Sequence, residues 1–252
     1  MNPILCPVRN GLHLTREAVR TFLAQDIGDV DVFLIDNDSR DGTTQWLWTQ
    51  PVRSVNLRPG KSVAASWNIG LRQLFKEGAE HVLVVNNDVE LRPDTYRHLV
   101  AAGALFVTAV GTRDRSKIAP PYSVPNSEQN RPHPDFSCFL IRREAWDRVG
   151  EFDECYAGAY CEDAAYHLRL HRAGITAYCL DLPFLHYGAQ TLANADQVEA
   201  AAIRFNADRN RALFLEREGV AVGSPEYYAV FGHDAPIEEA AAADPQPASL
   251  PA

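Results

Sequence analysis

The chain has 252 residues, of which 46% are hydrophobic and 23% are charged, and its formal net charge is −9. This composition is typical of a folded globular protein with enough chain for one large core. The negative net charge excludes a general electrostatic attraction to nucleic acid or to anionic membranes, and leaves room only for a local basic groove.

Strands and helices alternate over the first ninety or so residues. The hydrophobic pattern predicts strands at residues 4–6, 30–35, 52–57 and 82–85, and helices at residues 14–25, from residue 43, and at residues 63–75. Alternation of this kind favours a parallel, doubly wound sheet with right-handed crossovers.

The second half of the chain contains shorter predicted elements. They are strands at residues 105–110, 136–141 and 177–180, and helices at residues 94–102, 143–149, within 158–174, and at 197–218. The proline-rich stretch at 112–135 is typical of a functional loop or lid. From residue 235 the chain is acidic and rich in alanine and proline, and we expect it to be disordered.

The five cysteines are scattered, and no two form a CxxC pair. This argues against a disulfide framework or a zinc knuckle, so we expect five small buried side chains in a reducing compartment. The N-terminus lacks the basic and apolar regions of a signal peptide, and no apolar run approaches the roughly 20 residues that span a bilayer. We therefore expect a cytoplasmic protein, at most peripherally associated with a membrane.

Polar residues follow three of the predicted strands at their carboxyl ends, where open α/β sheets bind ligands. They are Arg9 and Asn10, Asp36 and Asp38, and Asn87 and Asp88. Oxygen ligands at Asp88 suit Mg²⁺ or Mn²⁺ and hence a diphosphate, whereas the alternative is a polar turn before the next helix. The chain has neither GxGxxG nor GxxxxGK[ST], so a nucleotide held at acidic residues needs a bridging metal.

Three further features have two interpretations each. Glu162 and Asp163 begin a predicted helix, where the helix dipole favours carboxylates, so they are either caps or catalytic groups. His186 follows an apolar pair, where a histidine is more often structural than a ligand. Arg204, Arg209 and Arg211 indicate either a solvated face or a site for a phosphate-bearing acceptor.

Several segments, in this order, resemble those of the family 2 inverting glycosyltransferases of the GT-A fold. They are ILCPVRN, IDNDSRDGT, GKSVAASWNIG, NNDVEL, FSCFLIRREAWDRVGEFDE, CEDAAYHLRLHRAG and LHYGAQT. An eighth, RNRALFL, is similar to a helix of the rhamnosyltransferase-like branch. The resemblance spans residues 3–217, and its most specific parts are the Asp-Gly-Thr and Glu-Asp motifs.

The resemblance implies a fold and a division of the chain. The fold is a GT-A type, Rossmann-like three-layer α/β sandwich with a mostly parallel central sheet. Residues 1–217 form the catalytic domain, with a nucleotide-sugar half at about 1–110 and an acceptor half at about 111–217. Residues 218–234 form a C-terminal extension, and residues 235–252 form the disordered tail.

The resemblance also implies an activity: inverting transfer of a sugar from a UDP- or dTDP-sugar to an acceptor hydroxyl. Asp163 is the expected general base, with Glu162 beside it. Asp88 is expected to hold Mn²⁺ or Mg²⁺ on the diphosphate, and His186 to complete the metal shell. The residues expected to bind the nucleotide sugar are Pro7, Arg9, Asn10, Asp36, Lys61, Asn68 and Asn87. Lys61 is included because of its charge.

Two positions depart from the family pattern: Asn86 replaces the first acid of the DXD motif, and Ala165 replaces a further acid after Asp163. A catalytically decayed nucleotide-sugar-binding module of the same fold is therefore the alternative. A nucleotidyltransferase is a third hypothesis, but PVRNGLHL lacks the glycine-rich basic loop expected of one. The acceptor stays open between a glycan, a lipid-linked sugar, a small molecule and a modified nucleic acid.

Overall fold

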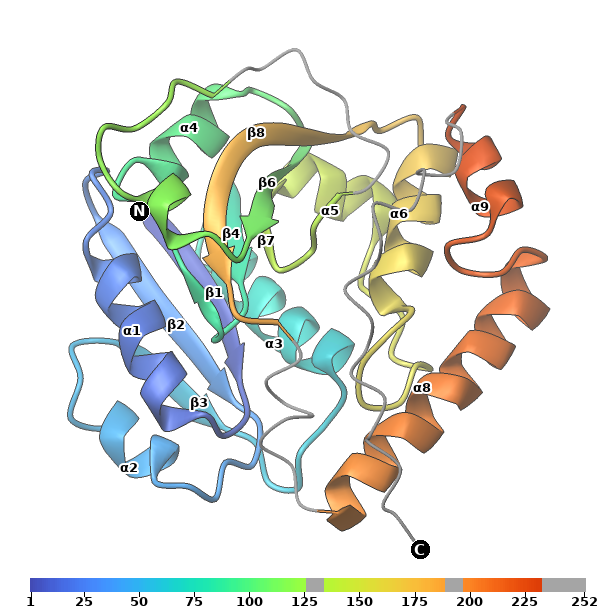
Figure 1. Cartoon of the computed structure of the whole chain (residues 1–252), viewed down its shortest axis with the longest axis horizontal. Helices are drawn as coiled ribbons and strands as arrows, with labels where there is room; N and C mark the ends of the chain where they lie inside the picture. Colours follow the sequence, from blue (N-terminus) through green and yellow to red (C-terminus); the bar gives the residue numbers. More distant parts are fainter. Residues whose placement is uncertain (126–133, 189–196, 233–252) are drawn as a thin grey trace, which may run out of the picture.

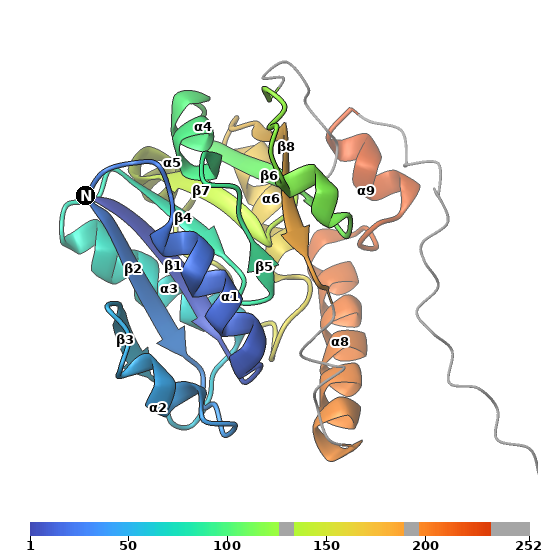
Figure 2. The ribbon, with the colours of Figure 1, turned by 60° about the vertical axis from the view of Figure 1, so that its left-hand side comes forward.

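The computed structural model describes residues 1–125, 134–188 and 197–232. In this part of the chain an eight-stranded sheet carries helices on both faces (Figures 1 and 2). The strands are β1 (Asn2–Val8), β2 (Val30–Asp36), β3 (Arg53–Asn56), β4 (His81–Val85), β5 (Val89–Glu90), β6 (Phe106–Thr112), β7 (Cys138–Arg142) and β8 (Ala177–His186).

The helices vary from one turn to six. They are α1 (Leu12–Leu23), α2 (Thr43–Leu47), α3 (Val63–Lys76), α4 (Thr95–Ala101), α5 (Arg143–Val149), α6 (Glu162–Arg172), α8 (Gln197–Glu218) and α9 (Pro225–Val230), with a 3₁₀ turn, η1 (Arg115–Ile118). No helix in the described ranges is both long and apolar enough to span a bilayer.

The strand order is β3-β2-β1-β4-β7-β6-β8-β5. Strands β3, β2, β1 and β4 run parallel to one another, and β6 runs parallel to β8. Strand β7 is antiparallel to β4 and β6, and β5 is antiparallel to β8. The predicted α/β class with a mostly parallel sheet is therefore confirmed.

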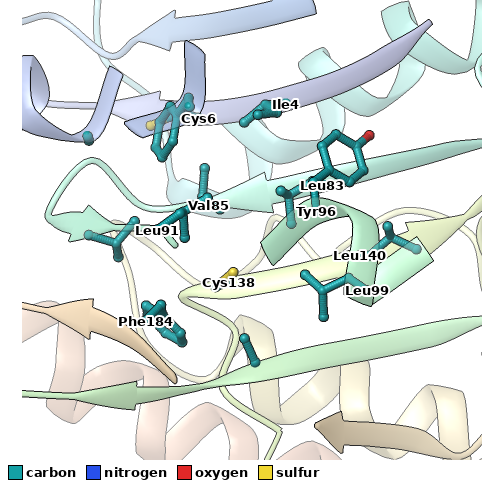
Figure 3. Packing of buried hydrophobic residues seen from close by; sticks show 14 of the residues in the cluster. Ile4, Cys6, Leu83, Val85, Leu91, Tyr96, Leu99, Cys138, Leu140 and Phe184 are labelled. Carbon is teal, nitrogen blue, oxygen red and sulfur yellow. The ribbon is translucent and has the colours of Figure 1, made fainter. Parts of the chain in front are cut away.

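Both faces of the sheet are buried because side chains alternate along each strand. Ile4 and Cys6 enter the core under α1 and α4, whereas Leu5 enters the core under α3, α5 and α6. Figure 3 shows the first of these cores, with Cys138 and Phe184 contributed by the second half of the chain. The long apolar runs of the sequence reflect this burial on two sides.

A third, smaller cluster joins α8 and α9 to α6. Its buried members are Tyr156, Cys161, Ala164, Ala165, Leu168, Phe214 and Tyr227. Helix α9 was not predicted, since its six residues lie in the expected extension at 218–234. All five cysteines are unpaired, and four are buried while Cys155 is half-buried.

Two predicted strands have different limits in the structure. The strand predicted at 177–180 continues to His186, because Leu182 and Phe184 are fully buried and Pro183 lies opposite Val110, just after an irregularity in the β6–β8 register. The strand predicted at 136–141 begins at Cys138 instead. The two-residue strand β5 was not predicted.

Two predictions fall on residues outside the described ranges. The loop predicted at 112–135 includes residues 126–133, and the disordered tail comprises 235–252. Within its described part, that loop forms the 3₁₀ turn η1.

Gly70 lets α3 lie close to β1, because a Cβ at this position would overlap the side chain of fully buried Leu5. We expect Gly70→Ala to lower the free energy of unfolding by about 1–2 kcal/mol, even after its gain in helix propensity. Urea denaturation measures this. Gly28→Ala is the control, since its Cβ would meet nothing within 4 Å. Equal stability of the two variants would contradict the close approach.

Candidate functional site

The polar residues singled out in the sequence gather at one edge of the sheet. Strands β1, β2 and β4 end at this edge because they are parallel. Strand β7 runs the other way, so β6 and β8 also end there. This is the edge at which open α/β sheets bind ligands.

Asp36 ends β2 and is 1% exposed. Its carboxylate accepts hydrogen bonds from Ser39 N (3.1 Å), Thr44 Oγ1 (2.5 Å) and Asn56 Nδ2 (2.7 Å). These bonds use three of roughly four acceptor positions of a carboxylate. Asp36 therefore shapes the β2–α2 loop, and a contact from it to a nucleobase stays a prediction.

Asn87 ties the end of β4 to the β1–α1 loop. Its Nδ2 donates to Asn10 O (3.1 Å) and to Thr15 Oγ1 (2.9 Å). Asn10 has a left-handed backbone, with φ at 56°, and its side-chain oxygen accepts a bond from Arg40 N. Three loops at this edge are thus fastened to one another by short side-chain bonds. Thr15 was not among the residues expected at the site.

Two cations, Arg9 and Lys61, lie on the β1 and β3 side of this edge. The backbone N–H and C=O of Lys61 both bond the side chain of Asn37, at 2.6 and 2.8 Å. A Cβ on Gly60 would lie 3.3 Å from Arg9 Nη1, so the guanidinium sits beside the turn before Lys61. Pro7 is half-buried in β1, opposite Ile35.

Asn68 has a different place from the one predicted. It is fully buried in α3, its Nδ2 donates to Phe152 O and Glu154 Oε1, and its Oδ1 accepts from Phe152 N, all at 2.9 Å. A side chain so enclosed and so occupied fastens the 152–154 segment to α3. We therefore do not retain Asn68 as a donor-binding residue.

Asp88 and His186 come together across the pairing of β5 with β8. His186 Nε2 lies 3.5 Å from Asp88 Oδ1, and Tyr187 N donates to Asp88 O. Burial lowers the pKa of His186, but the hydrogen bond and charge of Asp88, helped by Asp135, raise it further than burial lowers it. The charge of Arg113 opposes this rise.

Asp135 is a residue of this edge that the sequence analysis missed. Its carboxylate accepts from Gly111 N (3.2 Å) and Ser137 N (2.9 Å). Its charge contributes to a raised pKa at both His186 and Asp163, so it lies near both groups. In the sequence Asp135 closes a proline-rich stretch, and the available signal was an acid just before a buried strand.

A divalent cation would find two protein ligands here, Asp88 and His186. Within the described residues, no group of three or more His, Cys, Asp or Glu side chains is arranged to hold a metal ion. Mg²⁺ commonly takes one or two protein ligands and completes its shell with phosphate oxygens and water. The residues present therefore fit a cation that arrives with a diphosphate.

Glu162 and Asp163 begin α6. The loop before α6 meets the start of α3, because Val63 N donates to Gly158 O at 2.7 Å. Burial, and then the charge of Asp163, raise the pKa of Glu162, whose Oε2 is buried and has no hydrogen-bond partner in the described part of the chain. Burial also raises the pKa of Asp163. A carboxylate with a raised pKa is a stronger base at neutral pH.

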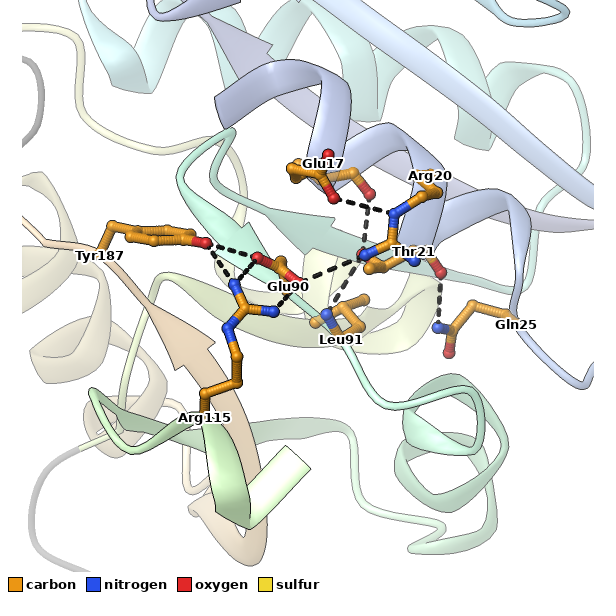
Figure 4. Close-up of polar contacts among 9 residues, drawn as sticks. Glu17, Arg20, Thr21, Gln25, Glu90, Leu91, Arg115 and Tyr187 are labelled. Carbon is orange, nitrogen blue, oxygen red and sulfur yellow. Dashed lines mark hydrogen bonds and ion pairs between the residues drawn. The ribbon is translucent and has the colours of Figure 1, made fainter. Parts of the chain in front are cut away.

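An ion-pair network lies next to the Asp88–His186 pair, around Glu90 (Figure 4). The Glu90 side chain is 2% exposed, and Arg115 binds it through two bonds of 2.5 and 3.0 Å. Tyr187 OH donates to it at 2.5 Å, and Arg20 lies 3.4 Å away. Residues from α1, β5, η1 and the end of β8 thus meet at one carboxylate.

Comparison with known proteins gives a family match and several structural likenesses. The sequence model described as "Glycosyl transferase family 2" matches residues 4–150, more than half of the chain. No curated protein is significantly similar in sequence. The mannosyltransferase PcManGT from Pyrobaculum calidifontis, in complex with GDP-Man and Mn²⁺, superposes with a TM-score of 0.58 at 18% identity, covering 91% of this chain and 78% of that one.

Two other solved structures are longer than this chain. TarS from S. aureus gives a TM-score of 0.59 at 18% identity, over 86% of this chain and 43% of its own. GalNAc-T7 with UDP, GalNAc and Mn²⁺ gives a TM-score of 0.59 at 12% identity, over 74% of this chain and 43% of its own. The chain thus spans less than half of these two proteins. At such identities the likeness concerns the fold, which is the GT-A fold.

Glu90→Gln keeps the shape of the side chain and removes its charge. We expect the free energy of unfolding at pH 7 to fall by about 1–3 kcal/mol, because Arg115 loses its charged partner and Arg20 loses one of two. Glu17→Gln is the matched control: it pairs with the same Arg20 but is 51% exposed. We expect that control to change stability by less than about 0.5 kcal/mol. Urea denaturation measures both.

The pH dependence gives a further test of the same pair of variants. Burial raises the pKa of Glu90, but bonds from Arg115 and Tyr187 outweigh it, so the pKa is lowered on folding. The stabilisation is therefore present above the unfolded value of about 4.3 and is lost as the pH falls through the lower folded value. The difference between wild type and Glu90→Gln should shrink below about pH 4. A constant difference would contradict the assignment.

Proposed function

The chain belongs to glycosyl transferase family 2, and from this premise we propose that it transfers a sugar from a nucleoside-diphosphate donor to an acceptor hydroxyl, with inversion at the anomeric carbon. The observation that carries the proposal is the joint position of Asp88, His186 and Asp163 at one edge of the sheet. They come from distant segments, and the charge of Asp135 raises the pKa of both His186 and Asp163. We further propose that the chain belongs to the rhamnosyltransferase-like branch of the family.

The donor would lie across the ends of β1, β2 and β4. Pro7, Arg9 and Asp36 would line the nucleobase, and Lys61 would reach a phosphate. Asn87 has its Nδ2 bonded to the β1–α1 loop, which leaves Oδ1 for the ribose. We propose a UDP- or dTDP-sugar. Because PcManGT was solved with GDP-Man and TarS with UDP-GlcNAc, a donor test has to include both kinds of base.

Asp88 and His186 would hold Mn²⁺ or Mg²⁺ on the diphosphate, and the bound cation would act as a Lewis acid that neutralises the charge of the leaving group. Asn86 supplies no charge at the first DXD position. Arg113 could help to neutralise the charge of the diphosphate. Its Nη2 lies 3.4 Å from where a Cβ on Gly188 would be, and its charge lowers the pKa of His186.

Asp163 would accept the proton of the acceptor hydroxyl as the oxygen attacks the anomeric carbon. The bond to the diphosphate breaks on the opposite side and its electron pair leaves with the phosphate, so the configuration inverts. An alcohol is a poor nucleophile at neutral pH, and a positioned base with a raised pKa assists it. Glu162 and Asp163 share burial and mutual repulsion, which favours keeping one proton between them.

A donor screen tests the proposal. Purified protein is incubated with UDP-, dTDP- and GDP-sugars, with Mn²⁺, Mg²⁺ or EDTA, and released nucleotide is measured with water or an added hydroxyl compound as acceptor. Metal-dependent release from one donor is the expected result. If no donor turns over and calorimetry detects no nucleotide binding, the proposal fails in favour of the decayed-module alternative.

Asp163→Asn should lower donor turnover by about 10²–10⁴-fold, because the variant keeps the shape of the side chain but cannot take a proton. Nucleotide affinity, measured by calorimetry, should stay unchanged, since the base faces the acceptor. Asp147→Asn, an exposed position on α5, is the control. Full activity in Asp163→Asn would rule out the assigned base.

Asp88→Asn should weaken nucleotide binding in the presence of Mn²⁺ by about tenfold or more, through loss of a charged ligand. The same titration with EDTA should show little difference between variant and wild type, because the cation is then absent from both. Equal affinities in Mn²⁺ would argue against a metal at Asp88.

A further inference from the structure

Asn210, on the long C-terminal helix α8, bonds the backbone of the loop that precedes α6. Its side chain is 0% exposed. Its Oδ1 accepts from Ala157 N at 3.1 Å, and its Nδ2 donates to three carbonyl oxygens: Ala157 and Ala159 at 2.9 Å and Tyr160 at 3.2 Å. One buried carboxamide therefore provides hydrogen-bond partners for four backbone groups of this loop.

The loop that Asn210 holds has an unusual backbone. Tyr160 and Cys161 are consecutive non-glycine residues with φ at 79° and 75°, in the left-handed region. Side-chain-bearing residues adopt this region at a cost, so surrounding contacts must maintain it. Cys161 is also the N-cap of α6, and its carbonyl accepts from Ala165 N at 2.9 Å.

The backbone at Tyr160 and Cys161 therefore sets the direction in which α6 starts. Glu162 and Asp163 are the next two residues, so their carboxylates turn with it. A second bond, from Val63 N to Gly158 O, fastens the loop to α3. The loop lies between α3 and α8, and Asn210 supplies the side-chain bonds from the α8 side.

Apolar contacts lie around these hydrogen bonds but do not fix the loop in the same way. Tyr156 and Cys161 lie in the buried cluster with Phe214 of α8, and the rings of Tyr156 and Phe214 are 6.4 Å apart. Such contacts hold α8 against the loop but are not directional. The hydrogen bonds of Asn210 fix the orientation of individual peptide groups, because they depend on angle as well as distance.

We propose that Asn210 is a positioning residue for Asp163: it keeps the 157–161 loop in the conformation that aims the Asp163 carboxylate at the acceptor hydroxyl. The inference rests on the proposed function, in which Asp163 is the base. It assigns a role to α8, which lies beyond residues 4–150 that match the family model. Misplacing a catalytic group by about 1 Å can slow a reaction about 10²-fold.

The test uses Asn210→Asp and the full-length protein. Aspartate has the same size and still accepts from Ala157 N, but its carboxylate cannot donate to the three carbonyl oxygens. With the donor that the wild type hydrolyses in the presence of metal, we expect kcat to fall by about 10–100-fold while the donor KM changes by less than about twofold. A kcat equal to that of the wild type overturns the proposal.

Phe214→Leu is the control for stability. It alters the same helix and the same buried cluster without touching the backbone bonds of the loop. Both variants are assayed well below their Tm. We expect Phe214→Leu to keep kcat, even where its Tm falls as far as that of Asn210→Asp. If both lose kcat in proportion to their loss of Tm, the role of Asn210 is structural and the proposal is wrong.

Two more variants keep the outcomes distinguishable. If Asn210→Asp does not fold, Asn210→Ser retains one hydroxyl donor and should give an intermediate kcat with an unchanged donor KM; wild-type kcat there overturns the inference. Asp163→Asn is assayed in parallel. If it is fully active, the assignment of Asp163 as the base fails, and the positioning role fails with it. If it is inactive while Asn210→Asp is fully active, only the positioning role fails.

Discussion

The short antiparallel pairing of β5 with β8 is the contact on which the site depends. It pairs Val89 with His186 and Glu90 with Leu185, and Tyr187 N extends it to Asp88 O. These few bonds join residues nearly one hundred positions apart in the chain. Glu90 bonds Tyr187 and Arg115, so the ion pair of a buried carboxylate stabilises the segment that carries the candidate metal ligands.

Carboxylates concentrated at one edge make that edge reactive toward protons and cations. Asp88, Asp135, Glu162 and Asp163 lie there in a chain that already has a net charge of −9. Burial, together with repulsion from a neighbouring carboxylate, raises the pKa of Glu162 and Asp163. The pKa of His186 is raised because the hydrogen bond and charge of Asp88, helped by Asp135, outweigh the lowering by burial. A cation bound on the β5–β8 side would relieve the repulsion between carboxylates, and a proton taken from an acceptor would relieve it at α6. The electrostatics thus favour the two events of the proposed mechanism, binding of a cation and uptake of a proton.

The part of the fold and site that follows from local pattern could be predicted from the sequence. Buried parallel strands appear in the sequence as apolar runs. Because the ends of such strands share one edge of the sheet, Asp36 and Asp88 could be assigned to that edge from the sequence. The buried contacts of Asn68 could not be predicted, because its partner Phe152 is 84 residues away and nothing in the local sequence distinguishes a buried amide from a ligand-binding one. Asp135 and strand β5 were missed since a single acid and two residues carry no periodicity.

The two halves of the proposed reaction also differ in how they are held. On the donor side, side-chain bonds of Asn37 and Asn87 fasten the loops at the strand ends to one another, and Asp36 holds the loop that follows its own strand. On the acceptor side, the start of α6 is left-handed at two non-glycine residues and relies on Asn210, some fifty residues further on. In the proposed mechanism, the base would thus be oriented by a helix separate from the loops of the proposed donor side. The conformation proposed to orient Asp163 therefore depends on a tertiary contact, which would make α8 part of the catalytic unit.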